Sequence, residues 1–558
     1  MIEKIEKIFN EEFKSLGYDI TCKIISSKEK NADFQCDDLF KLAKIYHKAP
    51  ITIGTEVVEK LKKHKKIFKT IECVKPGFIN ISVTDEFINE NLRQLIKDKK
   101  LKVKPSKSTI VLDYGGPNVA KPLHVGHLRT AIIGQSINNI LKFTGNKTIS
   151  DVHLGDIGTQ MGQVIFGILS DFPKQKAEDI QITLDYLNKT YPKISALCKE
   201  NDEVRNKCLE ITKELQNGNK KYKALWEKIY EISVKDIKRL YDYLDVKFDY
   251  WYGESDAYKE FEELFKFLNE KKVIEEDNGA KIINVKEESD KINIPPCIVQ
   301  KSDGAYLYAS SDLGTIWQRK RDFTPDNIIY ITDARQSLHF TQIFRVVSKT
   351  SMYKGKLEFC GYGTVNGKDG KPFKTRSGGS FKLDDLISSV KEEFKNLRKE
   401  NQKMDEKDLD IIVNAIIKYA DLQNDLTRNY IFDIKKFSEV NGKTGPYILY
   451  TYLRINKLLS SNNGILSDKI YNETDRKLRL KILEVSSIIN QSSKNRKPHY
   501  IASYLYDLSV LANNFYETNK MNNIEEDIRN DYDIVLTINN YILKTLLNLL
   551  GINIPKKM

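Results

Sequence analysis

The most regular pattern of apolar and polar residues starts with a short apolar run at residues 110–114. A continuous run of this length is typical of a strand buried on both faces of a parallel sheet. A Gly-Gly-Pro sequence at 115–117 ends the run, and from 124 to 145 apolar residues recur at helical spacing. Residues 147–152 can then form a second strand. The pattern predicts a strand–loop–helix–strand unit, which binds nucleotides at the carboxyl ends of its strands.

Two histidines stand at the start of the predicted helix. His124 and His127 are three residues apart, so both side chains can point the same way from the helix N-terminus. A helix N-terminus attracts phosphate, and Gly126 would let a nucleotide approach the backbone closely. Two histidines at this spacing are more often ordinary surface or core residues. The strand, the glycine-rich loop and the helix around this pair favour a phosphate-binding site instead.

The rest of the pattern predicts three domains. The chain opens with an α+β module, in which a first helix ends near Gly17 and a hairpin turns at Pro76-Gly77. A mainly helical stretch later gives way to β-rich runs, which predict the second half of a parallel sheet. These runs read CIVQ, AYLYAS, NIIYIT and EFCGYGTV. The end of the chain is helical again. We therefore expect domains at residues 1–105, 106–385 and 386–558, with a helical insertion at about 170–295.

Charge and cysteine usage narrow the partners and the compartment. The 558 residues include 90 Lys and Arg against 77 Asp and Glu, a net charge of +13. Such a balance favours a polyanionic partner, although a lysine-rich chain also gains general solubility. The seven cysteines are scattered without CxxC pairs, which argues against a disulfide framework or a structural zinc site. Without a leader-like N-terminus or a long apolar run, we expect a cytoplasmic protein with no membrane span.

A second candidate for handling phosphate lies at residues 363–383, which read GTVNGKDGKPFKTRSGGSFKL. A glycine-rich loop that carries Lys371, Lys374 and Arg376 can close over a polyphosphate. Taken alone, the stretch favours a basic hairpin loop.

Several stretches together resemble one family. HVGH is similar to the HIGH signature of class I aminoacyl-tRNA synthetases, and DYGGPNVAKPLHVGHLRT followed by HLGDIGTQMG resembles arginyl-tRNA synthetases in particular. FKTRS is similar to their degenerate KMSKS loop, and NGKTGPYILYTYLRINKL to the start of their anticodon-binding bundle. The resemblance implies an α/β fold: a Rossmann-like class I synthetase catalytic domain with a helical insertion. It also implies an N-terminal α+β module and a C-terminal all-α anticodon-binding bundle.

The resemblance implies ATP-dependent ligation of L-arginine to its cognate tRNA through an arginyl-adenylate. The substrates would be L-arginine, ATP with its Mg²⁺, and tRNA(Arg); we expect a monomer and no dedicated protein site for the metal. Attack of a carboxylate on the α-phosphate builds negative charge, so catalysis needs positioning and fixed donors. A class I synthetase of other specificity, or an inactive synthetase-like RNA-binding protein, remains an alternative at this point.

The resemblance also implies roles for single residues. Those implied in catalysis are His124, His127, Lys121, Lys374 and Arg376. Those implied to bind ATP are Val125, Gly126, His124, His127, Lys371, Phe373, Lys374 and Thr375. Those implied to bind arginine are Asp113, Asn118, His153, Tyr308, Asp312 and Gln336. Those implied to contact tRNA are Phe34, Gln35, Tyr447, Tyr450 and Arg454.

Three of these expectations need detail. Asp312 is expected to bind the guanidinium, beside a wall formed by Tyr308; alternatively, Asp312 caps a helix that starts at LGTIW. Asp156 and Gln160 are expected to line the same pocket as His153. The Gly115-Gly116 pair departs from the serine pair usual in the family.

Overall fold

The computed structural model describes residues 1–27, 29, 31–367, 369–371, 381–398, 404–459, 466–521 and 524–558. Contacts between residues divide the chain into two compact units. The first comprises Met1–Lys104, Ile448–Gln491 and Ser503–Leu546, and the second Pro105–Tyr447, Ser492–Ala502 and Leu547–Met558. Among the described residues, no helix has both the length and the apolar character needed to cross a bilayer.

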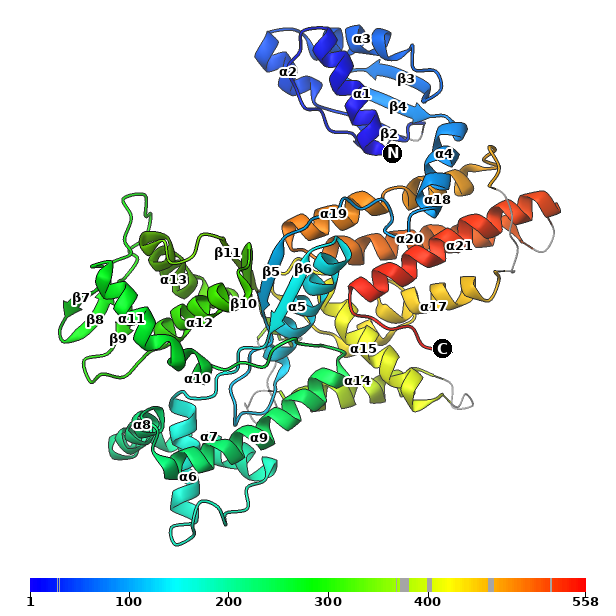
Figure 1. Cartoon of the computed structure of the whole chain (residues 1–558). Helices are drawn as coiled ribbons and strands as arrows, with labels where there is room; N and C mark the ends of the chain where they lie inside the picture. Colours follow the sequence, from blue (N-terminus) through cyan, green and yellow to red (C-terminus); the bar gives the residue numbers. More distant parts are fainter. Residues whose placement is uncertain are drawn as a thin grey trace. The chain divides into compact units, whose positions relative to one another are not determined.

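A four-stranded parallel sheet organises the second unit. Its strands lie in the order β11-β10-β5-β6. Their bounds are β5 (Thr109–Asp113), β6 (Lys147–Asp151), β10 (Asn327–Asp333) and β11 (Lys356–Tyr362). Helix α5 (Val125–Phe143) connects β5 to β6, and α13 (Ser337–Thr350) connects β10 to β11 (Figure 1). The chain order reverses between β5 and β10, so the carboxyl ends of these strands form the crevice where ligands bind in such folds.

The sequence pattern around β5 and α5 is confirmed. Ile110, Val111 and Leu112 are buried, as expected for a strand covered on both faces. The apolar face of α5 is buried throughout, and the chain leaves the helix at Gly145, whose φ of 90° is left-handed.

Four helices of the insertion follow β6: α6 (Thr159–Asp171), α7 (Leu184–Glu200), α8 (Asp202–Gln216) and α9 (Lys220–Tyr243). Two shorter ones, α10 (Glu254–Ala257) and α11 (Phe261–Glu270), come after them. The insertion is mainly helical, as expected, and differs from this pattern in its last part. There the chain forms β7 (Glu275–Asp277) and β8 (Ala280–Ile283) of an antiparallel sheet. Asn278 and Gly279 both have positive φ and make the two-residue turn that joins these strands.

Two of the four β-rich runs also differ from the prediction. CIVQ forms β9 (Cys297–Gln300), which pairs with β8 and not with the parallel sheet. AYLYAS runs into helix α12 (Tyr308–Phe323), because Ala309, Leu313 and Ile316 give it a buried face at helical spacing. The other two runs form β10 and β11 as expected.

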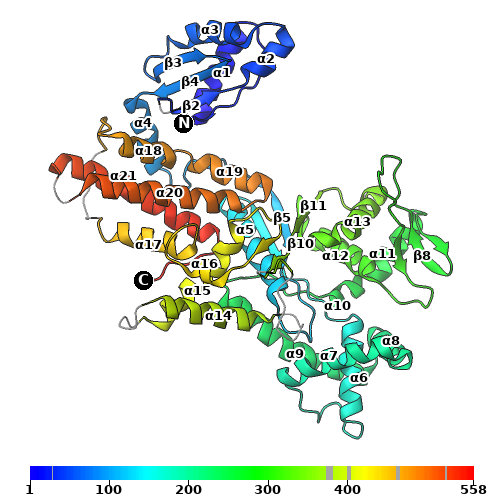
Figure 2. The ribbon, with the colours of Figure 1, turned by 180° about the vertical axis from the view of Figure 1, so that it is seen from behind.

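Short strands and helices complete the second unit. They are β12 (Val365–Asn366), α14 (Leu383–Leu397), α15 (Glu406–Leu422), β13 (Tyr430–Ile431) and α16 (Ile434–Ser438). Helices α14 and α15 lie side by side (Figure 2). Helix α15 also packs on α5, where Arg129 Nε lies 2.9 Å from Asp421 Oδ2 with both side chains almost fully buried.

The first unit begins with the α+β module. Its sheet has the order β1-β2-β4-β3, with β1 (Ile25–Ser26), β2 (Phe34–Cys36), β3 (Phe68–Val74) and β4 (Phe78–Val83). Its helices are α1 (Ile2–Ser15), α2 (Leu39–Tyr46), α3 (Pro50–Leu61) and α4 (Asp85–Ile96). The first helix ends next to Gly17 and the hairpin turns at Pro76-Gly77, as predicted.

The later helices are α17 (Gly445–Asn456), α18 (Glu473–Ile482), α19 (Val485–Asn495), α20 (His499–Asn519) and α21 (Glu526–Leu549). Within the first unit, Arg479 of α18 is fully buried and donates to Asp475 at 2.6 Å, to Asn89 at 2.8 Å and to Asp531. Because a buried guanidinium is costly without such partners, this cluster ties α4, α18 and α21 together.

Candidate active site

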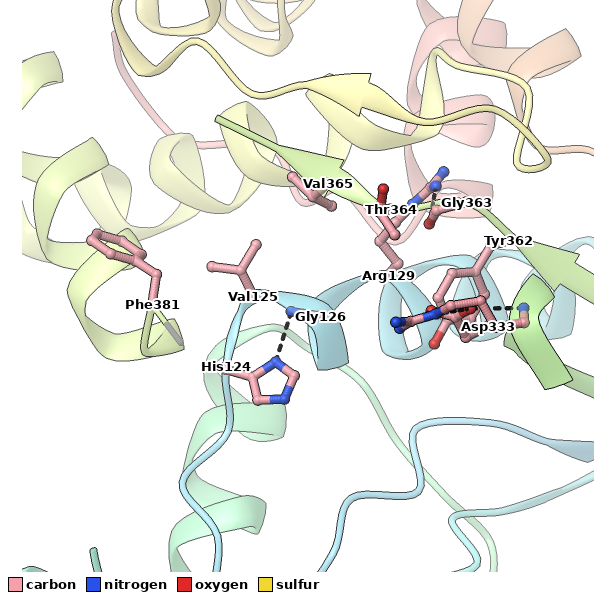
Figure 3. A pocket seen from close by; sticks show the side chains of 11 residues that line it. His124, Val125, Gly126, Arg129, Asp333, Tyr362, Gly363, Thr364, Val365 and Phe381 are labelled. Atoms are coloured by element: carbon pink, nitrogen blue, oxygen red, sulfur yellow. Dashed lines mark hydrogen bonds and ion pairs between the residues drawn. The ribbon is translucent and has the colours of Figure 1, made fainter. Parts of the chain in front are cut away.

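A cavity of about 690 Å³ opens at the carboxyl ends of β5 and β10. Nine of the residues implied in catalysis or in binding ATP or arginine line it: Asp113, Asn118, His124, Gly126, His127, His153, Tyr308, Asp312 and Gln336. A smaller cavity of about 140 Å³ shares His124 and Gly126 with it and is also lined by Val125, Arg129 and Phe381 (Figure 3). The structure therefore brings both predicted halves of the sheet to one crevice.

His124 and His127 cap helix α5. His124 Nδ1 accepts a hydrogen bond from the Gly126 N–H at 3.0 Å, and His127 Nδ1 accepts one from the His124 N–H at 3.2 Å (Figure 3 shows the first). Since Nδ1 accepts in each ring, the proton of the neutral imidazole lies on Nε2. Burial and the charge of Lys121 lower the pKa of His124. Burial, together with the charges of His124 and Lys121, lowers the pKa of His127 to about 3. Both rings are thus neutral Nε2–H donors.

Lys121 is not among the residues that line the cavity. Its Nζ lies 4.5 Å from the centroid of the Tyr191 ring, in α7 of the insertion. It is still near enough for its charge to lower the pKa values of both histidines.

The glycine-rich loop predicted at residues 363–383 is described only at its two ends. Lys371 lies in a turn where Gly367 N–H donates to the Lys371 carbonyl at 2.8 Å, and its exposed side chain lines neither cavity. Phe373, Lys374, Thr375 and Arg376 lie outside the described residues. The following Phe381 accepts from the Val125 N–H at 3.1 Å, so this end of the loop is fixed beside the histidines.

Asp113 already has a cationic partner in the chain. Arg319 Nη2 donates to Asp113 Oδ2 and to Asp151 Oδ2, each at 2.7 Å. Asp113 ends β5 and Asp151 ends β6, and Arg319 comes from α12. Burial raises the pKa of Asp113 above its ordinary value, although the charge of Arg319 opposes the change. Asp113 lines the cavity with one carboxylate oxygen committed to Arg319.

Asp312 lies in the second turn of α12, which begins at Tyr308 with Leu307 as its N-cap, so the capping alternative is wrong. Its Oδ2 lies 2.5 Å from Nε2 of His339 in α13. Contact with Asp312 raises the pKa of His339 even though burial opposes it. Tyr308 is four residues before Asp312 on the same helical face; it is 54% exposed and lines the cavity.

Glu254 also lines the cavity, although the sequence pattern did not predict it as a site residue. It is the first residue of α10, and burial together with the nearby Asp156 and Asp312 raises its pKa to about 8. Its only sequence signal is the acidic stretch GESD after a run of aromatic residues, which by itself indicates a helix N-terminus. Only the fold brings this carboxyl group near Asp312.

Asp156 and Gln160 hold the wall of the cavity without lining it. Asp156 accepts from the Ser255 N–H at 2.9 Å and the Ser255 hydroxyl at 2.6 Å, which fixes the helix that carries Glu254. Gln160 Nε2 donates to Asn118 Oδ1 at 3.2 Å. The expectation that both residues line the pocket is therefore wrong.

His153 and the glycine pair belong to one tight crossing. His153 has a φ of 44°, a strained value for this residue, and neither ring nitrogen has a hydrogen-bond partner among the described residues. A Cβ on Gly116 would overlap the carbonyl oxygens of Val152 and His153, and Gly115 has a φ of 75°. In this chain the glycine pair is thus required by the close approach of the two loops.

The residues predicted to contact RNA differ in how far their side chains are exposed. Phe34 is only 2% exposed in the core of the first module, so the expectation that its ring contacts tRNA is wrong. Gln35 donates to Asn80 at 2.8 Å and is half-buried. Tyr450 is exposed on α17, and Arg454 stacks over the Tyr516 ring with 4.4 Å between guanidinium carbon and centroid. Tyr447, on the same helix, is half-buried.

Comparisons with known proteins agree along the whole chain. Residues 91–434 match the family described as tRNA synthetases class I (R), catalytic domain. Residues 448–558 match the DALR anticodon binding domain, and residues 3–83 the Arginyl tRNA synthetase N terminal domain.

Individual proteins are similar over their full length. An arginine–tRNA ligase of Alkaliphilus oremlandii is 40% identical, with 100% of both chains covered. One of Francisella tularensis subsp. holarctica is 39% identical over 98% of both chains. The arginyl-tRNA synthetase structure of Plasmodium falciparum matches with a TM-score of 0.85 and 26% identity, covering 100% of this chain and 99% of that one. From the parallel sheet, the capped histidine pair and these full-length matches, we conclude that the chain belongs to the arginyl-tRNA synthetases of class I.

Proposed function

We propose that the protein ligates L-arginine to tRNA(Arg) in an ATP-dependent reaction that passes through arginyl-adenylate. The observation that carries the proposal is the composition of one cavity. Neutral imidazole donors at the start of α5 line it, and so do the carboxyl groups of Asp312 and Glu254. A cation with an attached carboxylate and a polyphosphate therefore find complementary groups in one crevice.

The acids divide between the two cationic ends of arginine. A planar guanidinium favours a fork of acceptors, which Asp312 and Glu254 offer beside the exposed face of Tyr308. Asp113 has only one oxygen free of Arg319, which suits the compact α-ammonium. Asn118, His153 and Gln336 line the same cavity and complete the set of polar contacts for arginine.

ATP would bind across the two cavities. The Nε2–H groups of His124 and His127 donate to phosphate oxygens, while Val125 and Gly126 line the smaller cavity where the nucleoside fits. Cations from Lys121, Lys371, Lys374 and Arg376 would approach the triphosphate, with Phe373 and Thr375 in the same loop. Asp333, a carboxylate that lines the smaller cavity, accepts two hydrogen bonds from the side chain of Arg335, so Mg²⁺ would arrive on the phosphates and be held by them.

The chemistry then follows from placement. The arginine carboxylate attacks the α-phosphorus of ATP, pyrophosphate leaves, and arginyl-adenylate forms. A hydroxyl at the tRNA 3′ end next attacks the arginyl carbonyl, and AMP leaves. Neutral histidine donors stabilise the charge on the phosphate oxygens without adding a proton that would have to be removed later.

The remaining parts would bind tRNA. We propose a tRNA-binding module at residues 1–105, a catalytic domain at 106–385 with its insertion at about 170–295, and an anticodon-binding domain at 386–558. Gln35, Tyr447, Tyr450 and Arg454 are candidate contacts, and Tyr450 has an exposed ring that a base can stack on. We further propose a cytoplasmic monomer; seven cysteines without a disulfide fit a reducing compartment.

A charging assay tests the proposal. Purified protein is incubated with ATP, tRNA(Arg) and each of the standard amino acids in turn, and acid-stable aminoacyl-tRNA is measured. We expect charging with arginine alone. Charging with another amino acid would indicate a synthetase of different specificity, and no charging with any amino acid would indicate a protein that only binds RNA.

A further inference from the structure

The chain places an arginine of its own next to the cavity proposed for substrate arginine. Arg319 is 1% exposed, and its Nη2 bridges the strand-end carboxylates of Asp113 and Asp151 at 2.7 Å each. Its guanidinium carbon lies 5.6 Å from the centroid of Tyr330, a ring that lines the cavity. So far Arg319 has appeared only as the partner of Asp113, without a role of its own.

The charges of Arg319 and its two carboxylate partners indicate a role for Arg319. Asp113 and Asp151 together would carry two negative charges at the carboxyl edge of the sheet, and Arg319 leaves one. Asp151 is fully buried behind Asp113, so the remaining charge is presented to the cavity through Asp113. One net negative charge matches one ammonium group.

Substrate arginine creates an ambiguity, since both of its ends are cationic. A cavity with two equally open acidic sites could bind it in either direction, and only one direction brings its carboxylate to the α-phosphate. Bidentate binding of a guanidinium needs both oxygens of a carboxylate. At Asp113 one oxygen is already taken by Arg319, and at Asp312 one oxygen is taken by His339. Glu254 adds a second carboxyl group at the Asp312 site, so that site still offers a guanidinium two acceptors.

We propose that Arg319 is a positioning and specificity-determining residue that makes Asp113 a site for the ammonium group only and so fixes the direction in which arginine binds. Helix α12 supports this role by its geometry. Asp312 and Arg319 are seven residues apart, so they lie on one face, separated by about 10 Å of helical rise. One rigid helix therefore presents the guanidinium acceptor and the group that blocks the wrong acceptor. The inference rests on the proposed function.

The test compares charge-altered variants. Arg319→Gln leaves two uncompensated carboxylates, Asp151→Asn leaves Asp113 with a full counter-charge, and the double variant R319Q/D151N restores one net negative charge. Arg321→Gln is the matched control, because Arg321 lies on the same helix with 53% of its side chain exposed and pairs with Glu260 and Asp322. Each variant is checked for folding by thermal unfolding. KM and kcat for arginine are measured in the charging assay.

A second ligand separates positioning from general damage. 5-Guanidinopentanoic acid has the guanidinium and carboxylate of arginine but no ammonium, and its inhibition constant is measured for each variant. We expect D151N to raise the arginine KM about tenfold or more with the inhibition constant of the analogue unchanged, because only the ammonium site loses its charge. We expect R319Q to lower kcat about tenfold or more, because arginine with its guanidinium at Asp113 is bound in an unproductive direction. We expect the double variant to recover the arginine affinity lost in D151N but to keep the low kcat of R319Q, and R321Q to behave as wild type.

Three outcomes would overturn the proposal: an unchanged kcat in R319Q, an equal loss of affinity for arginine and the analogue in D151N, or a double variant with the kcat of the wild type. If R319Q does not fold, D151N against the double variant makes the same comparison. If the wild-type protein charges no arginine, the proposed function fails and the role of Arg319 with it. Wild-type charging combined with any of the three outcomes removes only the role of Arg319.

Discussion

Single residues set the chemistry of the cavity through local hydrogen bonds. The two histidines cap α5 with their Nδ1 atoms, and this bond determines which ring nitrogen carries the proton. The two acids differ from each other. Asp312 is held by His339, whereas burial raises the pKa of Glu254 to about 8. The cavity thus contains two imidazole donors that are neutral at pH 7 and a glutamate, Glu254, whose charge changes near pH 8.

Asp312→Asn should weaken arginine binding selectively. The change removes the charge of a guanidinium partner in a part-buried site, where such a contact contributes about 1.5–3 kcal/mol. We expect the arginine KM to rise about 10- to 100-fold, with little change in the KM for ATP. Asp322→Asn is the control, since Asp322 lies on the same helix but pairs with Arg321 outside the cavity. Equal effects of the two substitutions would remove Asp312 from the binding site.

The arginine KM should also depend on pH. Glu254 has a raised pKa of about 8, so its carboxyl is protonated and neutral below that pH and becomes an anion above it. Only the anion pairs with a guanidinium, so we expect the arginine KM to fall as the pH rises from 6.5 to 8.5. His339 acts in the same direction, because its protonated form competes for Asp312. Steady-state kinetics of wild type and Glu254→Gln check this; a pH dependence that persists unchanged in E254Q would contradict the assignment to Glu254.

At the scale of elements, the sequence predicts what depends on local pattern. The strand and helix from residues 109 to 143 follow from a buried apolar run, a glycine-rich break and helical spacing. The sequence pattern gave wrong or incomplete predictions where tertiary contacts determine the structure. AYLYAS has strand-like residues but joins α12, and Glu254 enters the cavity only because Asp156 fixes α10. The partnership of Arg319 with two strand ends is likewise invisible in sequence, since its partners lie in other elements.

Gly162→Ala should destabilise the insertion although alanine favours helices. Replacing an interior helical glycine normally gains about 1 kcal/mol. Here an added Cβ would overlap the Cys208 carbonyl and the Thr212 hydroxyl where α6 crosses α8, and overpacking of this kind costs about 1–3 kcal/mol. We therefore expect a lower unfolding temperature. Ser170→Ala on the exposed side of α6 is the control, and a G162A protein as stable as S170A would contradict the close helix crossing.

For the whole molecule, the net charge of +13 becomes meaningful once tRNA is the proposed partner. Cationic side chains that neutralise phosphates release counterions, so the affinity for nucleic acid falls steeply with salt. Arginine and ATP would bind in the cavity at the carboxyl ends of β5 and β10, where partly buried charges are screened less by salt than exposed ones.

Raising the salt concentration from about 50 to about 200 mM should therefore increase the KM for tRNA much more than the KM for arginine. Charging kinetics at several salt concentrations, with each substrate varied in turn, measure both. A tRNA KM that does not respond to salt would contradict electrostatic binding of tRNA.

The central claim is that one cavity orients arginine with its guanidinium at Asp312 and Glu254 and its ammonium at Asp113. A crystal structure of the protein with arginine and a non-hydrolysable ATP analogue tests it most directly. The account predicts guanidinium nitrogens within hydrogen-bond distance of Asp312 and Glu254, and the arginine carboxylate facing the α-phosphate beside His124 and His127. A guanidinium bound at Asp113, or an arginine outside this cavity, would contradict it.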